Sequence, residues 1–256
     1  MPTVTQLTDR YANFLLPVLS RGDGVCEVCG TAVSGGWRCC YQCNAAAKKL
    51  GVGAVADTVD FVALAVKDEQ LAYELWKYKE RPSPAQVEIA LRLAALLWRW
   101  LAAHEACLGR DAACDGFSIA TTVPSGTGRA GEHPVEHMVS TVIRSTRTRY
   151  RPLLRSAGQG APVGRVFDAA RWIAEPLSGE SVLLVDDTWT TGSHAQSAAA
   201  ALKAAGAGHV AVVSIGRHFQ RRPAEERFKT VAEGYYRAAR RQGWDWESCR
   251  LCWVPT

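Results

Sequence analysis

The hydrophobic pattern of the chain alternates between short apolar runs and longer segments in which apolar residues recur at helical spacing. The short runs predict strands, and residues 182–185 have the composition of a strand that is buried on both faces. The predicted strands are residues 117–123, 182–185 and 209–215. The predicted helices are residues 7–19, 85–108, 193–205 and 224–241. The pattern therefore predicts an α/β fold with buried parallel strands.

Candidate chemistry is concentrated where the predicted strand at residues 182–185 ends. Two carboxylates and a turn rich in hydroxyl groups lead into the next helix: Asp186, Asp187, Thr188, Trp189, Thr190, Thr191, Gly192 and Ser193. Backbone amides at a helix N-terminus attract phosphate, and glycine permits close backbone approach. With carboxylates at the carboxyl end of a strand, these groups predict a sugar-phosphate site. The alternative is a turn without a ligand, although capping the helix needs only one acidic residue.

A second turn of small residues follows the predicted strand at residues 117–123. It consists of Pro124, Ser125, Gly126, Thr127, Gly128 and Arg129. Ligands of open α/β sheets bind at the carboxyl ends of strands, so we expect this turn to face Asp186 and Asp187. Ser125, Gly126 and Arg129 are the predicted anion contacts, and a plain glycine turn is the alternative.

A basic segment rich in Arg, Gly and Pro covers residues 144–180. Its composition is typical of a mobile loop, and its arginines would attract an anion. The alternatives are a solvated face or non-specific affinity for nucleic acid. Arg155 and Arg165 are equal candidates for a ligand contact.

Nine cysteines are present, and their spacing carries more information than their number. Cys26-x-x-Cys29 and Cys40-x-x-Cys43 bracket a glycine-containing loop. Two such pairs present four thiolates to one tetrahedral Zn²⁺, so these residues predict a structural zinc site. Cys39 is an alternative ligand to Cys40. Disulfides, which a reducing compartment disfavours, and buried thiols are the competing interpretations.

A further pair, Cys249-x-x-Cys252, lies in a tryptophan-containing context. Three interpretations are open. The cysteines are small residues packed beside tryptophans, ligands of a second metal site with Cys107 and Cys114, or a redox-active pair.

The 256 residues and the net charge of +5 are compatible with one sizeable α/β domain and a small appendage. We predict an N-terminal helix and zinc-binding module over residues 1–50 and the α/β domain over residues 51–256. No apolar stretch reaches the length of a membrane span, and the N-terminus lacks a signal-peptide pattern. We therefore expect a cytoplasmic protein that does not enter membranes.

Residues 182–193 resemble the phosphosugar motif of the type I phosphoribosyltransferases, in which a strand, two acidic residues, a Thr-Thr-Gly loop and a helix follow one another. The resemblance implies an open, mostly parallel sheet flanked by helices and phosphoribosyl pyrophosphate as substrate. It assigns Asp186 and Asp187 to the ribose hydroxyls, with Mg²⁺ nearby, and residues 188–193 to the 5′-phosphate. Trp189 stands at a usually aliphatic position, so it either shapes the pocket or blocks part of it.

Over most of its length the chain resembles the ComF/GntX-type proteins, which place a four-cysteine module before a type I phosphoribosyltransferase domain. Lys77-Tyr78-Lys79 and Val123-Pro124 are looser matches, and the stretch after Pro124 departs from the family pattern. The resemblance implies transfer of a phosphoribosyl group to a nitrogen nucleophile. It gives catalytic roles to Asp186 and Asp187, and it places Arg129 with a loop arginine on the departing pyrophosphate.

Two other functions compete with this one. The first is a noncatalytic phosphosugar- or nucleotide-binding protein that acts through DNA or a protein partner, as in DNA uptake. The second is a zinc-dependent hydrolase, because residues 133–137 match the His-x-x-Glu-His order of the inverzincin peptidases. Pro134 confines that motif to a first helical turn, so His133 and His137 are expected to be surface residues. The acceptor base and the oligomeric state, with a dimer as one option, are left open.

Overall fold

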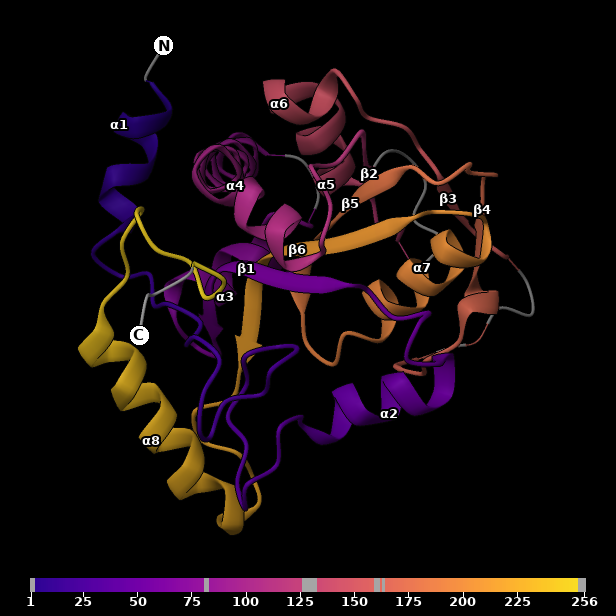
Figure 1. Cartoon of the computed structure of the whole chain (residues 1–256). Helices are drawn as coiled ribbons and strands as arrows, with labels where there is room; N and C mark the ends of the chain where they lie inside the picture. The colour runs from indigo at the N-terminus through magenta and orange to yellow at the C-terminus, as the bar shows by residue number, and fades with distance from the viewer. Residues whose placement is uncertain (1–2, 81–82, 126–132, 159–161, 163, 253–256) are drawn as a thin grey trace.

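Four parallel strands form one sheet at the centre of the molecule (Figure 1). The structure is a computed structural model, and it describes residues 3–80, 83–125, 133–158, 162 and 164–252. The strands lie in the order β1-β6-β5-β2 and comprise β1 (Thr58–Val66), β2 (Ile119–Thr122), β5 (Ser181–Trp189) and β6 (His209–Phe219). An antiparallel pair consists of β3 (Leu154–Ser156) and β4 (Trp172–Ala174). The predicted α/β fold with buried parallel strands is confirmed.

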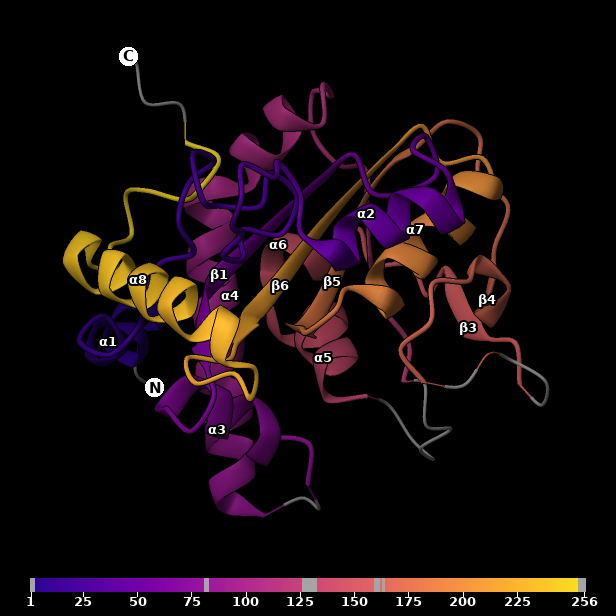
Figure 2. The ribbon, with the colours of Figure 1, turned by 90° about the horizontal axis from the view of Figure 1, so that it is seen from below.

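Side chains along β5 alternate between two hydrophobic clusters, one on each face of the sheet. Val182 and Leu184 belong to one cluster and Leu183 and Val185 to the other, and all four are fully buried. The first face is covered by α2 (Tyr41–Leu50), α7 (Ser193–Ala204) and α8 (Glu226–Gln242) (Figure 2). The second face is covered by α3 (Gln70–Lys77), α4 (Pro84–Asp111) and α5 (Pro134–His137), and α1 (Val4–Thr8) packs on α4. Shorter turns are η1 (Asp9–Tyr11), η2 (Met138–Val142), α6 (Arg144–Arg147) and η3 (Ala169–Arg171).

The long helix predicted at residues 85–108 is confirmed as α4. It begins with Pro84 in its first turn, and the Ser83 hydroxyl accepts from the backbone N–H of Gln86. Leu93, Leu97 and Leu101 recur at helical spacing and are buried against the sheet. Within the part of the chain that the structure describes, no helix combines the length and apolarity needed to cross a membrane.

The N-terminal segment differs from the helix predicted at residues 7–19, because α1 ends at Thr8 and only the short turn η1 follows. Leu15 and Leu16 pack into opposite hydrophobic clusters, and the backbone N–H of Leu64 donates to the Leu16 carbonyl. Neighbouring side chains that point in opposite directions require an extended backbone, which excludes a helix here.

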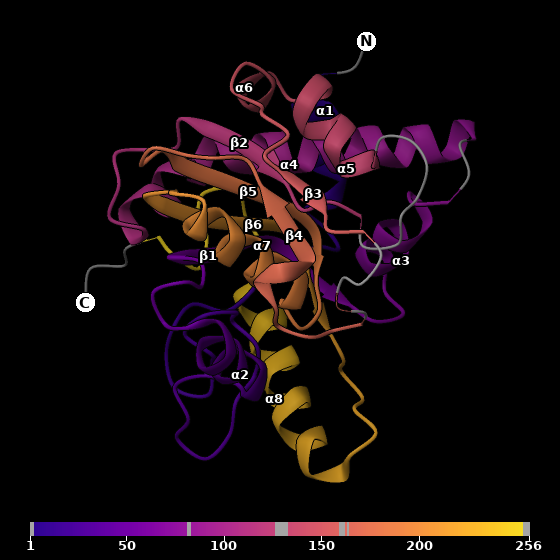
Figure 3. The same cartoon turned by 90° about the vertical axis from the view of Figure 1, so that its right-hand side faces the viewer.

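The cysteine-containing segment packs on the first face of the sheet. Cys26, Cys29 and Cys43 are buried and share one hydrophobic cluster with residues of β1, β5 and β6. Helix α2 ends at Leu50, where the predicted division between the module and the α/β domain lies. Figure 3 shows α2 and α8 on the same side of the sheet.

Candidate functional site

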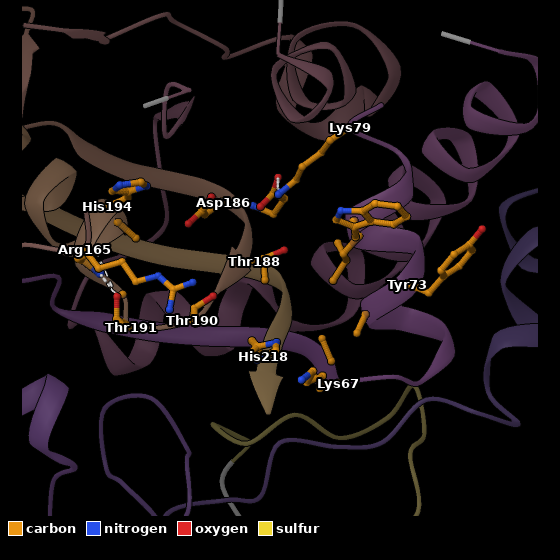
Figure 4. Close-up of a pocket in the computed structure, with 18 of the residues that line it drawn as sticks. Lys67, Tyr73, Lys79, Arg165, Asp186, Thr188, Thr190, Thr191, His194 and His218 are labelled. Atoms are coloured by element: carbon orange, nitrogen blue, oxygen red, sulfur yellow. Dashed lines mark hydrogen bonds and ion pairs between the residues drawn. The ribbon is translucent and has the colours of Figure 1, made fainter. Parts of the chain in front are cut away.

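A pocket of about 940 Å³ lies at the carboxyl end of the sheet. Its wall takes residues from the ends of β1 and β5, from β6, and from α3 and the start of α7 (Figure 4). This is the edge where parallel α/β sheets bind ligands, and the volume suits a ligand of nucleotide size. The predicted site residues on the wall are Asp186, Asp187, Thr188, Thr190, Thr191, Gly192 and Ser193.

The turn between β5 and α7 has a conformation that only glycine fits well. Gly192 has φ of 79° and precedes the first residue of α7, and a Cβ there would lie 2.1 Å from the Trp189 ring. The Thr191 hydroxyl accepts from the backbone N–H of Ser193 at 3.3 Å. The start of α7 lies at the pocket wall, and a helix N-terminus is a place where anions bind.

Trp189 does not line the pocket. Its side chain is buried in the hydrophobic cluster beneath the turn, with its ring edge against Phe61 at a centroid distance of 5.8 Å. The tryptophan thus supports Gly192 from below and leaves the pocket mouth clear.

The two carboxylates of the motif have different environments. Tyr78 donates a short hydrogen bond to Asp187, and Lys79 Nζ lies 2.8 Å from the same oxygen. Burial opposes ionisation of Asp187, but the charge and hydrogen bond of Lys79, with that of Tyr78, lower its pKa. Burial, and then the charge of Asp187, raise the pKa of Asp186 to about 7. One carboxylate is therefore a fixed anion at neutral pH, and the other titrates there.

Two parts of the site were not predicted from residue chemistry. Tyr78 and Lys79 were noted only as part of a loose family match. Their contact with Asp187 could not be predicted, because they lie far from Asp187 in the sequence. Lys67 and Asp68 follow β1 and also line the pocket, and Asp68 has φ of 70°. Residues 54–66 were not assigned as a strand, so the end of β1 gave no signal.

The basic segment contributes one arginine to the pocket. Arg165 lines the wall beside the turn, and its side chain extends toward Thr190 in Figure 4. Arg155 lies on β3 and is exposed. Arg171 fixes the backbone just before Arg165. Its guanidinium donates to the Pro162 and Gly164 carbonyls at 2.9 and 2.8 Å.

The second predicted turn is described only in part. Val123 N donates to the Val185 carbonyl at 3.0 Å, which brings this strand end beside the start of the acidic pair. Ser125 is not among the pocket-lining residues. Gly126 and Arg129 lie outside the described residues.

The four predicted zinc ligands converge. One sulfur from each of Cys26, Cys29, Cys40 and Cys43 lies within 4.8 Å of the others. Cys29 Sγ and Cys40 Sγ are 3.7 Å apart. Tetrahedral zinc with bonds of about 2.3 Å to sulfur requires an edge of about 3.8 Å. The cluster is compatible with structural zinc, and Cys39 lies outside it.

Arg217, on β6, joins this cluster to the turn. Its buried guanidinium donates to the carbonyls of Trp189 and Thr190 at 3.2 Å each, and to the Cys29 carbonyl at 3.0 Å and sulfur at 3.4 Å. Hydrogen bonds within the cluster, first that of Cys26, and the charge of Arg217 hold the pKa of Cys29 well below its ordinary value. Sequence reasoning missed Arg217 because the predicted strand stopped at residue 215.

Metal-ligating side chains also converge at a second place. The described residues contain two such groups, and the second consists of His104, Cys107, Cys249 and Cys252. Cys114 belongs to neither group, and neither do His133 and His137, so the inverzincin-like motif forms no metal site among the described residues.

Comparison with models of protein families, with curated proteins and with solved structures finds no match to this chain. Any function must therefore be argued from the pocket, the turn and the two groups of metal-ligating residues.

The raised pKa of Asp186 predicts a pH-dependent effect on stability. The folded protein holds this proton more tightly than the unfolded chain, so the contribution of Asp186 to stability falls as the pH rises from 3.8 to about 7. Asp186→Asn removes this cost. We expect the variant to be more stable than the wild type at pH 8, by on the order of 2 kcal/mol, and the gain to shrink toward pH 5.

Urea unfolding at both pH values measures this difference, with Asp115→Asn at an exposed position as the control. An equal gain at pH 5 and pH 8 would contradict the assignment.

Arg217→Met should loosen the turn by removing its connection to Cys29. The change leaves buried carbonyls without donors, so we expect a loss of about 3 kcal/mol in unfolding free energy and faster amide exchange at residues 190–193. Hydrogen exchange read by mass spectrometry measures this. Arg227→Met, at an exposed ion pair, is the matched control. Unchanged exchange in the Arg217 variant would remove the linking role.

Proposed function

We propose that this protein is a phosphoribosyltransferase of the type I class, which binds phosphoribosyl pyrophosphate with Mg²⁺ and transfers the phosphoribosyl group to a nitrogen nucleophile. The observation that carries the proposal is the shared pocket wall of Asp186, Asp187 and the turn that precedes α7. A phosphosugar needs hydrogen-bond acceptors for its hydroxyls beside amide and hydroxyl donors for its phosphate. This wall offers both, in the order that the resemblance implies.

The turn would hold the 5′-phosphate. Thr190, Thr191 and Ser193 supply hydroxyl groups, and the first amides of α7 supply N–H donors and the positive end of the helix dipole. Asp186 and Asp187 would accept from the ribose hydroxyls. Because Tyr78 and Lys79 hold Asp187 in place, its carboxylate is oriented before the sugar binds.

The departing pyrophosphate requires positive charge beside it. Lys67 and Arg165 line the pocket and supply it. The carboxylate of Asp186 is the oxygen ligand type that suits Mg²⁺, which proteins commonly hold through one or two carboxylates and substrate phosphates. Bound Mg²⁺ would neutralise charge on the pyrophosphate.

In the transfer step the bond from C1 to the pyrophosphate oxygen breaks, and the electron pair leaves with the pyrophosphate. The nitrogen lone pair forms the new bond to C1, and the nitrogen proton passes to solvent. Positive charge develops on the ribose ring, where the two carboxylates stabilise it. No protein nucleophile is needed.

The side of the pocket formed by α3 favours a planar acceptor. Tyr73 and Trp76 both line the pocket and are largely exposed, with their ring centroids 6.2 Å apart. Flat heterocycles pack well on such rings, so the proposed acceptor is a nitrogen heterocycle.

The four-cysteine cluster would bind zinc in a structural role. Four thiolates leave no open coordination position for water, which argues against zinc-dependent hydrolysis. Its contribution to function would pass through Arg217, which connects Cys29 to the phosphate-binding turn.

Calorimetric titration of phosphoribosyl pyrophosphate with Mg²⁺ tests the donor site. We expect saturable binding to the wild type, and its loss in the Asp186→Asn, Asp187→Asn double variant, with Asp115→Asn as a control that keeps wild-type affinity. Absence of binding to the wild type would refute the proposal. Binding without pyrophosphate release across a panel of nitrogen heterocycles would instead favour the noncatalytic alternative.

The two loop arginines can be separated by matched substitutions. Arg165→Gln should weaken phosphoribosyl pyrophosphate binding by roughly 10- to 100-fold, because a charge-assisted hydrogen bond contributes about 1.5–3 kcal/mol. Arg155→Gln should leave the affinity within about twofold, since Arg155 is exposed on β3. Equal losses in both variants would contradict the placement of Arg165.

A further inference from the structure

The second group of metal-ligating residues joins two segments that are far apart in the sequence. His104 and Cys107 lie one turn apart near the end of α4, whereas Cys249 and Cys252 belong to the segment after α8. The sulfur of Cys252 lies 3.5 Å from Cys249 Sγ, 3.8 Å from Cys107 Sγ and 3.6 Å from His104 Nδ1. The His104 Nδ1 to Cys107 Sγ distance is 4.0 Å.

Three of these separations match the edges of a metal-centred tetrahedron, and the fourth, between His104 Nδ1 and Cys107 Sγ, is longer. Zinc with bonds of about 2.3 Å to sulfur and about 2.0 Å to nitrogen gives edges between about 3.5 and 3.8 Å. A disulfide would need sulfur atoms about 2.0 Å apart. The backbone N–H of Cys249 also donates to Cys252 Sγ at 3.1 Å, and Arg110 Nη2 lies 3.2 Å from Cys107 Sγ. Each contact places an N–H donor on a sulfur atom.

The histidine is oriented as a metal ligand. His104 is buried, and its Nε2 lies 3.0 Å from the Trp246 carbonyl, which can only accept a hydrogen bond. The proton is thereby assigned to Nε2, so the lone pair of Nδ1 faces the three sulfur atoms. Metal-binding histidines commonly use their second nitrogen in this way.

We propose that His104, Cys107, Cys249 and Cys252 bind a second zinc ion, separate from the four-cysteine cluster. Three thiolates and one imidazole in a tetrahedron are a zinc ligand set, and four protein ligands make the site structural. This inference does not depend on the proposed transferase activity.

The second zinc site would also support the first. Arg250, between Cys249 and Cys252, is buried and donates to the Glu27 and Val28 carbonyls at 2.8 and 3.1 Å. Those two residues lie between the ligands Cys26 and Cys29. A zinc ion bound to Cys249 and Cys252 would fix the turn that carries Arg250, and so keep Arg250 on the two carbonyls between Cys26 and Cys29.

Metal analysis of the full-length protein tests the site. We expect two zinc ions per chain in the wild type, one in Cys252→Ser and one in Cys43→Ser, and two in Cys114→Ser, which is the matched control. The proposal would be overturned if the wild type held one zinc ion per chain and the Cys252→Ser variant also held one. So would a Cys249–Cys252 disulfide in the freshly purified protein, detected by mass spectrometry after alkylation.

A second variant guards against loss of folding. His104→Cys converts three thiolates and an imidazole into four thiolates, so we expect two metal ions per chain and a shift of the cobalt(II) d–d bands to longer wavelength. An unchanged cobalt spectrum would exclude His104 as a ligand.

Arg250→Met should keep both zinc ions but speed transfer of one to a chelator severalfold, and an unchanged rate would remove the link between the sites.

Discussion

The buried guanidinium of Arg217 is the interaction on which the arrangement of the pocket depends. A positive charge inside an apolar cluster is costly unless acceptors surround it. The neighbouring His218 carbonyl accepts at 2.6 Å, and the other acceptors come from two distant parts of the chain. Cys29 provides a carbonyl and a sulfur, and Trp189 and Thr190 provide carbonyls at the end of β5. All the hydrogen bonds of this side chain form together when the cysteine module and the turn before α7 are both in position.

The same principle explains the contrast between the two carboxylates. The two carboxylates are adjacent, so ionising both costs free energy through their mutual repulsion. Lys79 and Tyr78 lower the pKa of Asp187, so Asp187 is the one that is ionised. Asp186 is left with the cost of burial and of its neighbour's charge. A cation or hydroxyl donors beside Asp186 would relieve this repulsion, and such a cost at a site is a common compromise between stability and function.

Local sequence patterns predicted the features whose cause is local. These features are the apolar run at residues 182–185, the Thr-Thr-Gly turn, the paired cysteines and the helical spacing of α4, and each lies within one continuous segment of the chain. The direction of Trp189 could not be predicted, because this last residue of β5 departs from the alternation and joins the cluster of Val182 and Leu184. Tyr78, Lys79, Arg217 and Arg250 could not be assigned either, since each acts on a partner remote in sequence. The two-domain division and the roles of Gly126 and Arg129 stay predictions.

The contact of Arg250 with the first pair of cysteines has a consequence for the order in which the molecule can assemble. It spans 223 residues to Glu27, so it closes one of the longest loops in the chain. During synthesis the N-terminal knuckle emerges first, yet this contact becomes available only after every strand and α8 have been made. Until then the segment between Cys26 and Cys29 lacks its contact with Arg250, so its packing is completed only late in folding.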